Sequence, residues 1–159
     1  GVEAIVSRFN GGPMTFEDLL GNLESQPIGG VWISGGYKTD WNDEAVAEKF
    51  AGLKTLIVQD LFTSPLLEIA HFQLPGAAFA ERDGSHVNFA DRLQTVAWAI
   101  RPPAGVQVEG RMFWRLLKRP GMFNARQVMK EIASQIAYFA PAMNDVPDVG
   151  VDLKVNNLA

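Results

Sequence analysis

The fold is decided by two short apolar runs, Val31-Trp32-Ile33-Ser34 and Leu56-Ile57-Val58. The first run is followed by Gly35-Gly36 and the second by Gln59-Asp60. Short apolar runs with such endings are typical of buried strands that lead into tight loops. Each run therefore predicts a strand with its carboxyl end at the polar or glycine residues.

The residues between these runs predict a helix that ends at Gly52, with Asp40 or Asn42 as its cap. Strand, helix and strand within about thirty residues form a βαβ unit, whose crossover is right-handed in nearly all proteins. The sequence predicts an α/β fold with a mostly parallel, Rossmann-like sheet, helices on both faces and a short hairpin. One domain is expected over residues 1–140, and residues 141–159 are expected to be a tail or the start of a next domain.

Capping signals place further elements. Thr15, with Asp18 three residues on, predicts the start of a helix, and Asn124 predicts the start of another that runs to Phe139. Asp83-Gly84 is the strongest signal for a hairpin or tight turn.

Composition excludes several function classes. The chain has 159 residues, a net charge of -4 and no cysteine, which rules out cysteine nucleophiles, thiolate zinc sites and Fe–S ligation within it. The acidic balance argues against nucleic acid as a partner, and no apolar run is long enough to span a membrane. Because the chain opens with Gly1 and no Met, we expect a processed chain or an excised piece of a longer protein.

The most basic stretch is RMFWRLLKR, Arg111 to Arg119. Its interleaved apolar residues favour an amphipathic helix that packs its apolar side inward. A membrane-surface helix or a partner helix is the alternative.

Ligands of open parallel sheets bind beyond the carboxyl ends of the strands. Gly35-Gly36 lets the backbone approach a ligand, although the pair matches no phosphate-binding motif and is equally consistent with a plain turn. Asp60 can accept hydrogen bonds from a ribose or a guanine edge, or cap the helix expected near Pro65.

A hydrolase is a further alternative, because Ser34 follows a strand and Asp60, His71 and His86 come later in the chain. The nucleophile elbow G-x-S-x-G lacks its first glycine here. The two histidines, without clustered carboxylates, do not predict a metal site.

A longer pattern, from Thr55 to Leu117, resembles the molybdopterin oxidoreductase family. That family shows V-Q-D-x-F, A-D-x-x-L-P, and E-x-x-G-T-x-x-N followed by R-x-Q. The matching segments here are Leu56–Phe62, Ala70–Pro75, Ala80–Asn88, Asp91–Gln94 and Pro102-Pro103.

The resemblance implies a domain that packs against a bis-molybdopterin guanine dinucleotide in active enzymes. It also implies the residues on the cofactor side, although Arg92 could instead pair with Glu81 and only support the hairpin. These candidates are Gly35, Gly36, Asp60, Glu81, Gly84, Asn88, Arg92 and Gln94.

The chain departs from the family pattern where cofactor contacts are expected. The departures are Gly35-Gly36-Tyr37-Lys38 for G-x-N-P, Thr63-Ser64-Pro65 for T-E-T, Ala70-His71 for A-D and Gly84-Ser85 for Gly-Thr. Because the loop is altered, we expect guanine nucleotides to bind this chain weakly or not at all.

Such drift is tolerated in one branch of the family, the large Fe–S subunit of bacterial NADH-quinone oxidoreductase (NADH dehydrogenase), where this region is a structural relic. Our main hypothesis is therefore a scaffold fragment of that type, without catalytic residues, metal or cofactor of its own. Its partners would be the rest of the parent polypeptide and other subunits of a respiratory complex, on the cytoplasmic side of the inner membrane. The alternative is a domain of an active molybdenum enzyme such as formate dehydrogenase, contributing to binding of molybdopterin guanine dinucleotide.

Overall fold

The computed structural model describes residues 1–9, 12–36 and 40–154. The described residues form two compact units, which we treat separately. The sheet unit comprises residues 14–79 and 102–109, and the hairpin unit comprises residues 1–13, 80–101 and 110–159, in each case as far as they are described.

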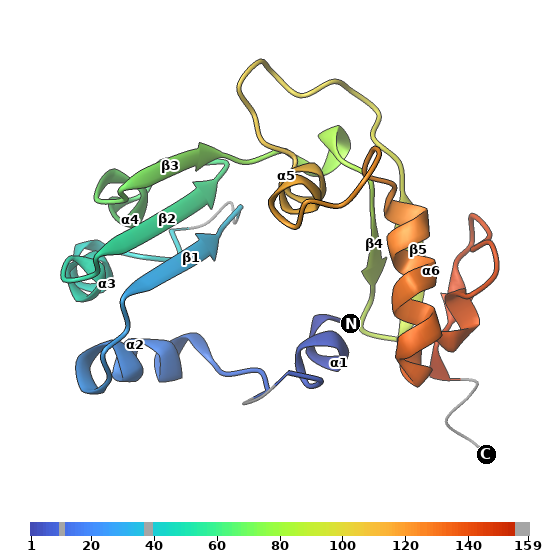
Figure 1. The fold of residues 1–159 in the computed structure, drawn as a ribbon, viewed down its shortest axis with the longest axis horizontal. Helices are drawn as coiled ribbons and strands as arrows, with labels where there is room; N and C mark the ends of the chain where they lie inside the picture. The colour runs from blue at the N-terminus through green and yellow to red at the C-terminus, as the bar shows by residue number, and fades with distance from the viewer. Residues whose placement is uncertain (10–11, 37–39, 155–159) are drawn as a thin grey trace. The chain divides into compact units, whose positions relative to one another are not determined.

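The sheet unit is built on three parallel strands in the order β1-β2-β3 (Figure 1). They are β1 (Gly30–Ser34), β2 (Thr55–Asp60) and β3 (Phe72–Pro75). In the register of the sheet, Ser34 pairs with Gln59 and Asp60 pairs with Pro75, so the carboxyl ends of all three strands lie at one edge. The predicted βαβ unit and the α/β class are confirmed.

The helices of the sheet unit are α2 (Phe16–Ser25), α3 (Glu44–Phe50) and α4 (Pro65–Glu68). The predicted capping box of α2 is present: Thr15 Oγ1 accepts from Asp18 N, and Asp18 Oδ2 accepts from Thr15 N, both at 3.1 Å. The cap predicted for α3 at Asp40 or Asn42 is wrong. Asp43 Oδ1 caps it at 2.9 Å from Val46 N, because the Asn42 amide oxygen instead accepts from Leu66 N at 3.0 Å.

The core of the sheet unit lies between the sheet and these helices. Phe50, Leu56, Val58 and Leu66 are completely buried there, and apolar residues of α2 pack against the same cluster. Because side chains alternate along a strand, Leu56 and Val58 of β2 point toward the helices, and Ile57, which lies between them, points away. Burial of these side chains on one face holds the strands in register.

The hairpin unit contains an antiparallel sheet in the order β4-β5-β6. Its elements are α1 (Val2–Val6), η1 (Phe79–Glu81), β4 (Gly84–Val87), β5 (Arg92–Val96), α5 (Glu109–Leu116), α6 (Ala125–Gln135), η2 (Ala137–Ala142) and β6 (Val151–Asp152). The first residues of η1 and α5, Phe79 and Glu109, are assigned to the sheet unit. Asn124 caps α6 as predicted, through its side-chain oxygen and Gln127 N. The helix ends before Phe139, where a 3₁₀ segment follows.

The turn of the hairpin is not where Asp83-Gly84 predicts it. Gly84 already pairs with Val96 in the β4–β5 ladder, and the chain reverses over residues 88–91. Asn88 Oδ1 accepts from Ala90 N at 2.9 Å and from Arg92 N at 3.0 Å. This local side-chain bonding stabilises the reversal without an Asp-Gly pair.

A second core, within the hairpin unit, includes Leu93, Met129, Phe139, Ala142 and Leu153, all buried. Residues beyond 140 thus pack against the hairpin sheet and α6. The domain boundary after residue 140 stays a prediction.

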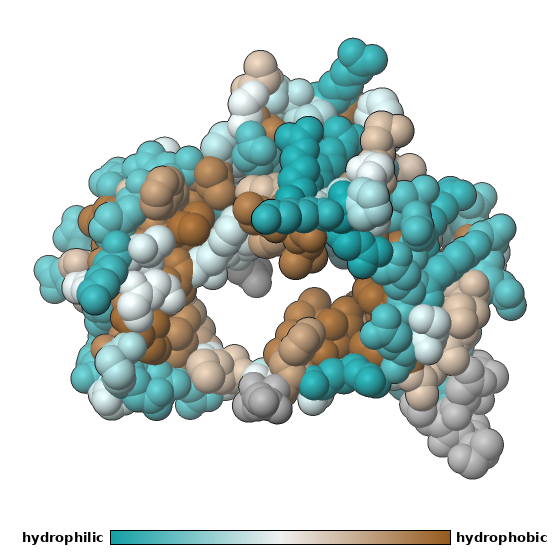
Figure 2. All heavy atoms as spheres, viewed as in Figure 1, coloured by the Kyte–Doolittle hydropathy of each residue, from teal (hydrophilic) through white to brown (hydrophobic). Residues whose placement is uncertain are grey.

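The basic stretch forms α5 and the turn after it. Trp114 is buried in the hairpin unit, with Arg119 stacked 4.6 Å from the ring centroid, while Leu116 and Leu117 are exposed. Figure 2 shows hydrophobic residues, in brown, at the surface of both units. Within the described ranges, no helix has the length and apolar character needed to cross a bilayer.

Candidate functional site

The carboxyl edge of the parallel sheet brings Gly35 and Asp60 together. A Cβ built on Gly35 would collide with Asp60 Oδ2 and would lie 2.5 Å from the carboxyl carbon of that residue. Gly36, the next residue, has a φ of +112°, in the region that favours glycine. Both glycines are therefore required by local geometry, one by close approach and the other by its backbone conformation.

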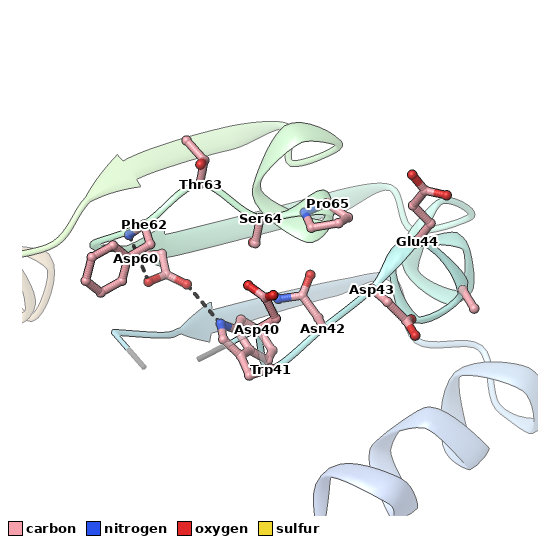
Figure 3. A pocket seen from close by; sticks show the side chains of 11 residues that line it. Asp40, Trp41, Asn42, Asp43, Glu44, Asp60, Phe62, Thr63, Ser64 and Pro65 are labelled. Carbon is pink, nitrogen blue, oxygen red and sulfur yellow. Dashed lines mark hydrogen bonds between the residues drawn. The ribbon is translucent and has the colours of Figure 1, made fainter. Parts of the chain in front are cut away.

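The Asp60 carboxylate is buried, with 5% exposure, and its oxygens are held from two directions. Oδ1 accepts from the backbone N–H groups of Leu61 at 2.7 Å and Phe62 at 3.3 Å. Oδ2 accepts from the indole Nε1 of Trp41 at 3.2 Å (Figure 3). Asp60 does not cap α4, because Ser64 Oγ caps that helix by accepting from Leu67 N.

A cavity of about 630 Å³ opens beside Asp60. It is lined by residues 40–45, by Phe62–Pro65 and by Asp60, and Figure 3 shows these side chains around it. Four lining residues are carboxylates: Asp40, Asp43, Glu44 and Asp60. Among the described residues, no Lys or Arg lines this cavity.

The chemistry of the cavity follows from these groups. Carboxylates accept hydrogen bonds from N–H and O–H donors and repel anions. At the wall, the Asn42 amide nitrogen is buried and has no hydrogen-bond partner in the part of the chain that the structure describes. The ring of Phe62 is half exposed and offers an apolar face. The site suits a neutral, partly planar ligand with hydrogen-bond donors, and it does not suit a phosphate.

The other predicted site residues lie in the hairpin unit. Asn88 is engaged in the turn, and Arg92 Nη1 donates to the carbonyl of Val149 at 3.0 Å. Gln94 pairs with His86 across the hairpin. Gly84 begins β4, and Glu81 ends η1. Their assignment to a cofactor stays a prediction, and only Gly35, Gly36 and Asp60 share an edge of the parallel sheet.

The arrangement of the sheet unit does not form the hydrolase triad considered above. His71 Nδ1 accepts from Leu56 N at 3.1 Å, near the start of β2. Asp60 ends the same strand, four residues on, which corresponds to about 13 Å of extended chain. His86 belongs to the hairpin unit, on an exposed position of β4. Across the described ranges, no group of three or more His, Cys, Asp or Glu side chains could hold a metal ion.

The sequence does not predict Trp41 or Asn42 as site residues, and it presents Phe62 only as the final residue of the segment that matches V-Q-D-x-F. Trp41 lies next to the capping residues of α3, and its only sequence signal is a large polar-tipped aromatic in an acidic loop. Phe62 follows the strand end at Asp60 by two residues. Tyr37 and Lys38, which alter the expected loop, lie outside the described residues.

A parallel sheet with a cavity beside Asp60, at the carboxyl end of its central strand, is typical of the class of α/β proteins that bind their ligands beyond the strand ends. The model of the molybdopterin oxidoreductase family matches residues 12–119 of this chain. The chain belongs to this family.

Three relatives carry formate dehydrogenase names. The chain is 32% identical over 101 residues to F420-dependent formate dehydrogenase 1 subunit alpha of Methanococcus maripaludis, and 29% identical over 99 residues to F420-dependent formate dehydrogenase subunit alpha of Methanocaldococcus jannaschii. Each match covers 60% of this chain and 15% of the relative, so the chain spans a small part of the relatives' length. These relatives are not NADH-quinone oxidoreductase subunits, and they give that more specific expectation no support.

Proposed function

We propose that this chain is part of a molybdenum oxidoreductase alpha subunit of the formate dehydrogenase type. In this proposal, the carboxyl edge of its parallel sheet holds the nucleoside end of a molybdopterin guanine dinucleotide. Support comes from the family match and from relatives that are 26% to 32% identical and are named F420-dependent formate dehydrogenase alpha subunits.

The observation that carries the proposal is the buried Asp60 carboxylate beside Gly35, at the wall of the cavity. Guanine presents N–H donors on one edge and ribose presents hydroxyl groups, and a carboxylate accepts from both. The carboxylate acceptor at the cavity wall therefore fits the nucleoside end of the cofactor.

The same wall does not fit the pyrophosphate. Four carboxylates with no cationic residue among the described lining would repel it. We therefore expect the pyrophosphate and the pterin to be held by other parts of the parent polypeptide. When bound, the molybdenum centre would supply the redox chemistry, while the residues of this chain only bind and orient the nucleoside.

The direct test is an NMR titration of the 159-residue chain with guanosine monophosphate (GMP) and adenosine monophosphate (AMP). It is run in about 1 M NaCl, where the Debye length is about 3 Å, so that repulsion between the carboxylates and the phosphate that both ligands share is screened. We expect weak GMP binding, with a Kd on the order of 0.1–1 mM, and weaker AMP binding because adenine lacks the N1–H donor. Asp60→Asn should weaken GMP binding about tenfold.

Phe62→Leu provides a second variant, because it changes an exposed side chain that does not support the core, and it should weaken binding about fivefold through lost stacking. Glu48→Gln, on an exposed position of α3 outside the cavity, is the control and should bind GMP as the unmodified chain does. No GMP binding, or equal binding of GMP and AMP, would reject the proposal.

A scaffold without cofactor, of the NADH-quinone oxidoreductase type, is the second candidate. It is favoured by the structural use of two positions that depart from the family pattern: Ser64 caps α4, and His71 accepts from Leu56 N. Molybdenum analysis of the purified parent protein separates the candidates, since a folded parent without molybdenum or pterin supports the scaffold. In both cases the proposed partners are the rest of the parent polypeptide and other subunits of its complex, and a cytoplasmic location is part of the proposal.

A further inference from the structure

We propose that Trp41 is a positioning residue, whose indole N–H orients the Asp60 carboxylate so that it presents one remaining acceptor site to the cavity. This inference rests on the proposed function, because it concerns how the same site would select a nucleoside. Trp41 itself does not need to touch the ligand.

The hydrogen bonds of Asp60 divide unequally between its two oxygens. Each carboxylate oxygen has about two acceptor positions. Oδ1 uses both on the backbone N–H groups of Leu61 and Phe62, whereas Oδ2 accepts from Trp41 Nε1. Counting the described residues, one acceptor position therefore remains, and it is on Oδ2.

The donors also differ in origin. Leu61 and Phe62 follow Asp60 directly in the chain, so their N–H groups stay close to it in any folded variant. Trp41 belongs to the loop before α3, nineteen residues away in sequence. The tertiary fold thus contributes one donor, and that donor binds the oxygen that is left for a ligand.

Gly35 constrains the carboxylate from the neighbouring strand. Oδ2 lies so close to Gly35 that a Cβ at this position would collide with it. Because glycine leaves this space, the Asp60 side chain can lie against the end of β1 while Trp41 holds it there. The position of Oδ2 thus depends on the lack of a side chain at Gly35 and on the hydrogen bond from the Trp41 indole.

The ring and the N–H of Trp41 have separable roles. The ring packs edge-on against Phe16, with centroids 5.9 Å apart, and joins the core cluster of the sheet unit. Phenylalanine at position 41 would retain an aromatic ring for this contact, while it removes the N–H donor together with part of the indole's volume. Trp41→Phe is therefore the informative variant.

The test is a double-mutant cycle on GMP binding by the full 159-residue chain, with Trp41→Phe, Asp60→Asn and the double variant, each first checked for folding by circular dichroism. If Trp41 acts through Asp60, Trp41→Phe weakens GMP binding about fivefold in the unmodified background and less than about twofold in the Asp60→Asn background. Trp98→Phe, in the hairpin unit, is the matched control and should leave the affinity for GMP unchanged.

AMP gives a second measurement that does not require Asp60→Asn to fold. Trp41→Phe should change AMP affinity less than about twofold, because adenine lacks the N1–H that would donate to Oδ2. Equal losses for GMP and AMP, equal losses in both backgrounds, or unchanged GMP binding by Trp41→Phe would overturn the role of Trp41 and leave the proposed function standing. Absence of GMP binding by the unmodified chain would overturn both.

Discussion

The Asp60 carboxylate packs so closely on Gly35 that a Cβ at position 35 would collide with Oδ2. The two residues come from the ends of neighbouring strands of the parallel sheet, and the Gly35 N–H also donates to the carbonyl of Gln59 at 2.8 Å. This contact couples the backbone at the end of β1 to a buried charge at the end of β2.

Gly35→Ala should therefore destabilise the sheet unit. The added methyl group collides with a carboxylate that three N–H donors hold in place, and overpacking of this kind costs about 1–3 kcal/mol. The free energy of unfolding from urea denaturation measures the loss. Gly52→Ala is the control, because a Cβ there meets nothing within 4 Å; equal stability of the two variants would contradict the close contact.

The histidine that departs from the family pattern has a structural use that can be tested. His71→Ala removes the acceptor for Leu56 N and should cost about 1 kcal/mol in the free energy of unfolding. His71→Asp supplies a carboxylate oxygen in its place and should recover most of the loss. If both variants are as stable as the unmodified chain, the bond does not contribute to folding.

Asn88 distinguishes a structural turn from a ligand contact. Asn88→Ala deletes the acceptor for Ala90 N and Arg92 N and should lower the free energy of unfolding by about 1 kcal/mol. Asn88→Asp keeps an acceptor oxygen and should be close to the unmodified chain in urea denaturation. If Asn88→Asp is no more stable than Asn88→Ala, the acceptor bonds to Ala90 N and Arg92 N do not account for the stability of the turn.

The hydrogen-bonded pair Tyr138 and Asp91 predicts that the folding stability depends on pH in both alkali and acid. Burial, followed by the hydrogen bond to Asp91, raises the pKa of Tyr138 from 10.0 to about 12. The hydrogen bond from Tyr138, followed by that from Lys154, lowers the pKa of Asp91 below 3.8. The Tyr138 contribution to stability is thus complete below pH 10 and lost as the pH rises toward 12, whereas the Asp91 contribution is present above pH 3.8 and lost as the pH falls further.

Tyr138→Phe should reduce both effects, because it removes the hydroxyl and keeps the ring that packs on Phe139. Thermal unfolding across the pH range should show a smaller loss of Tm in alkali for this variant and a smaller loss in acid. Absorbance titration of the phenolate should lose the transition near pH 12 that Tyr138 contributes. A Tm profile parallel to that of the unmodified chain would show that the pair is not coupled to folding.

Local residue patterns were sufficient to predict much of the sheet unit. The apolar runs at Val31–Ser34 and Leu56–Val58, with a helix between them, imply parallel strands because short crossovers are right-handed and helix-covered. Thr15 and Asn124 predicted helix starts because a cap acts on N–H groups only two or three residues away. The family resemblance likewise depended on order and spacing along the chain.

Only the tertiary structure decided the roles of polar side chains whose hydrogen-bond partners are remote in sequence. Asn42 does not cap α3, because its side-chain oxygen accepts from Leu66 N, which is remote in sequence. Trp41 entered the site only because the loop before α3 reaches the end of β2, and Asn88 was assigned to a turn by its bonds in the hairpin unit. Strand position follows from local periodicity, but the direction and partner of a polar side chain depend on which segments folding brings within hydrogen-bond distance.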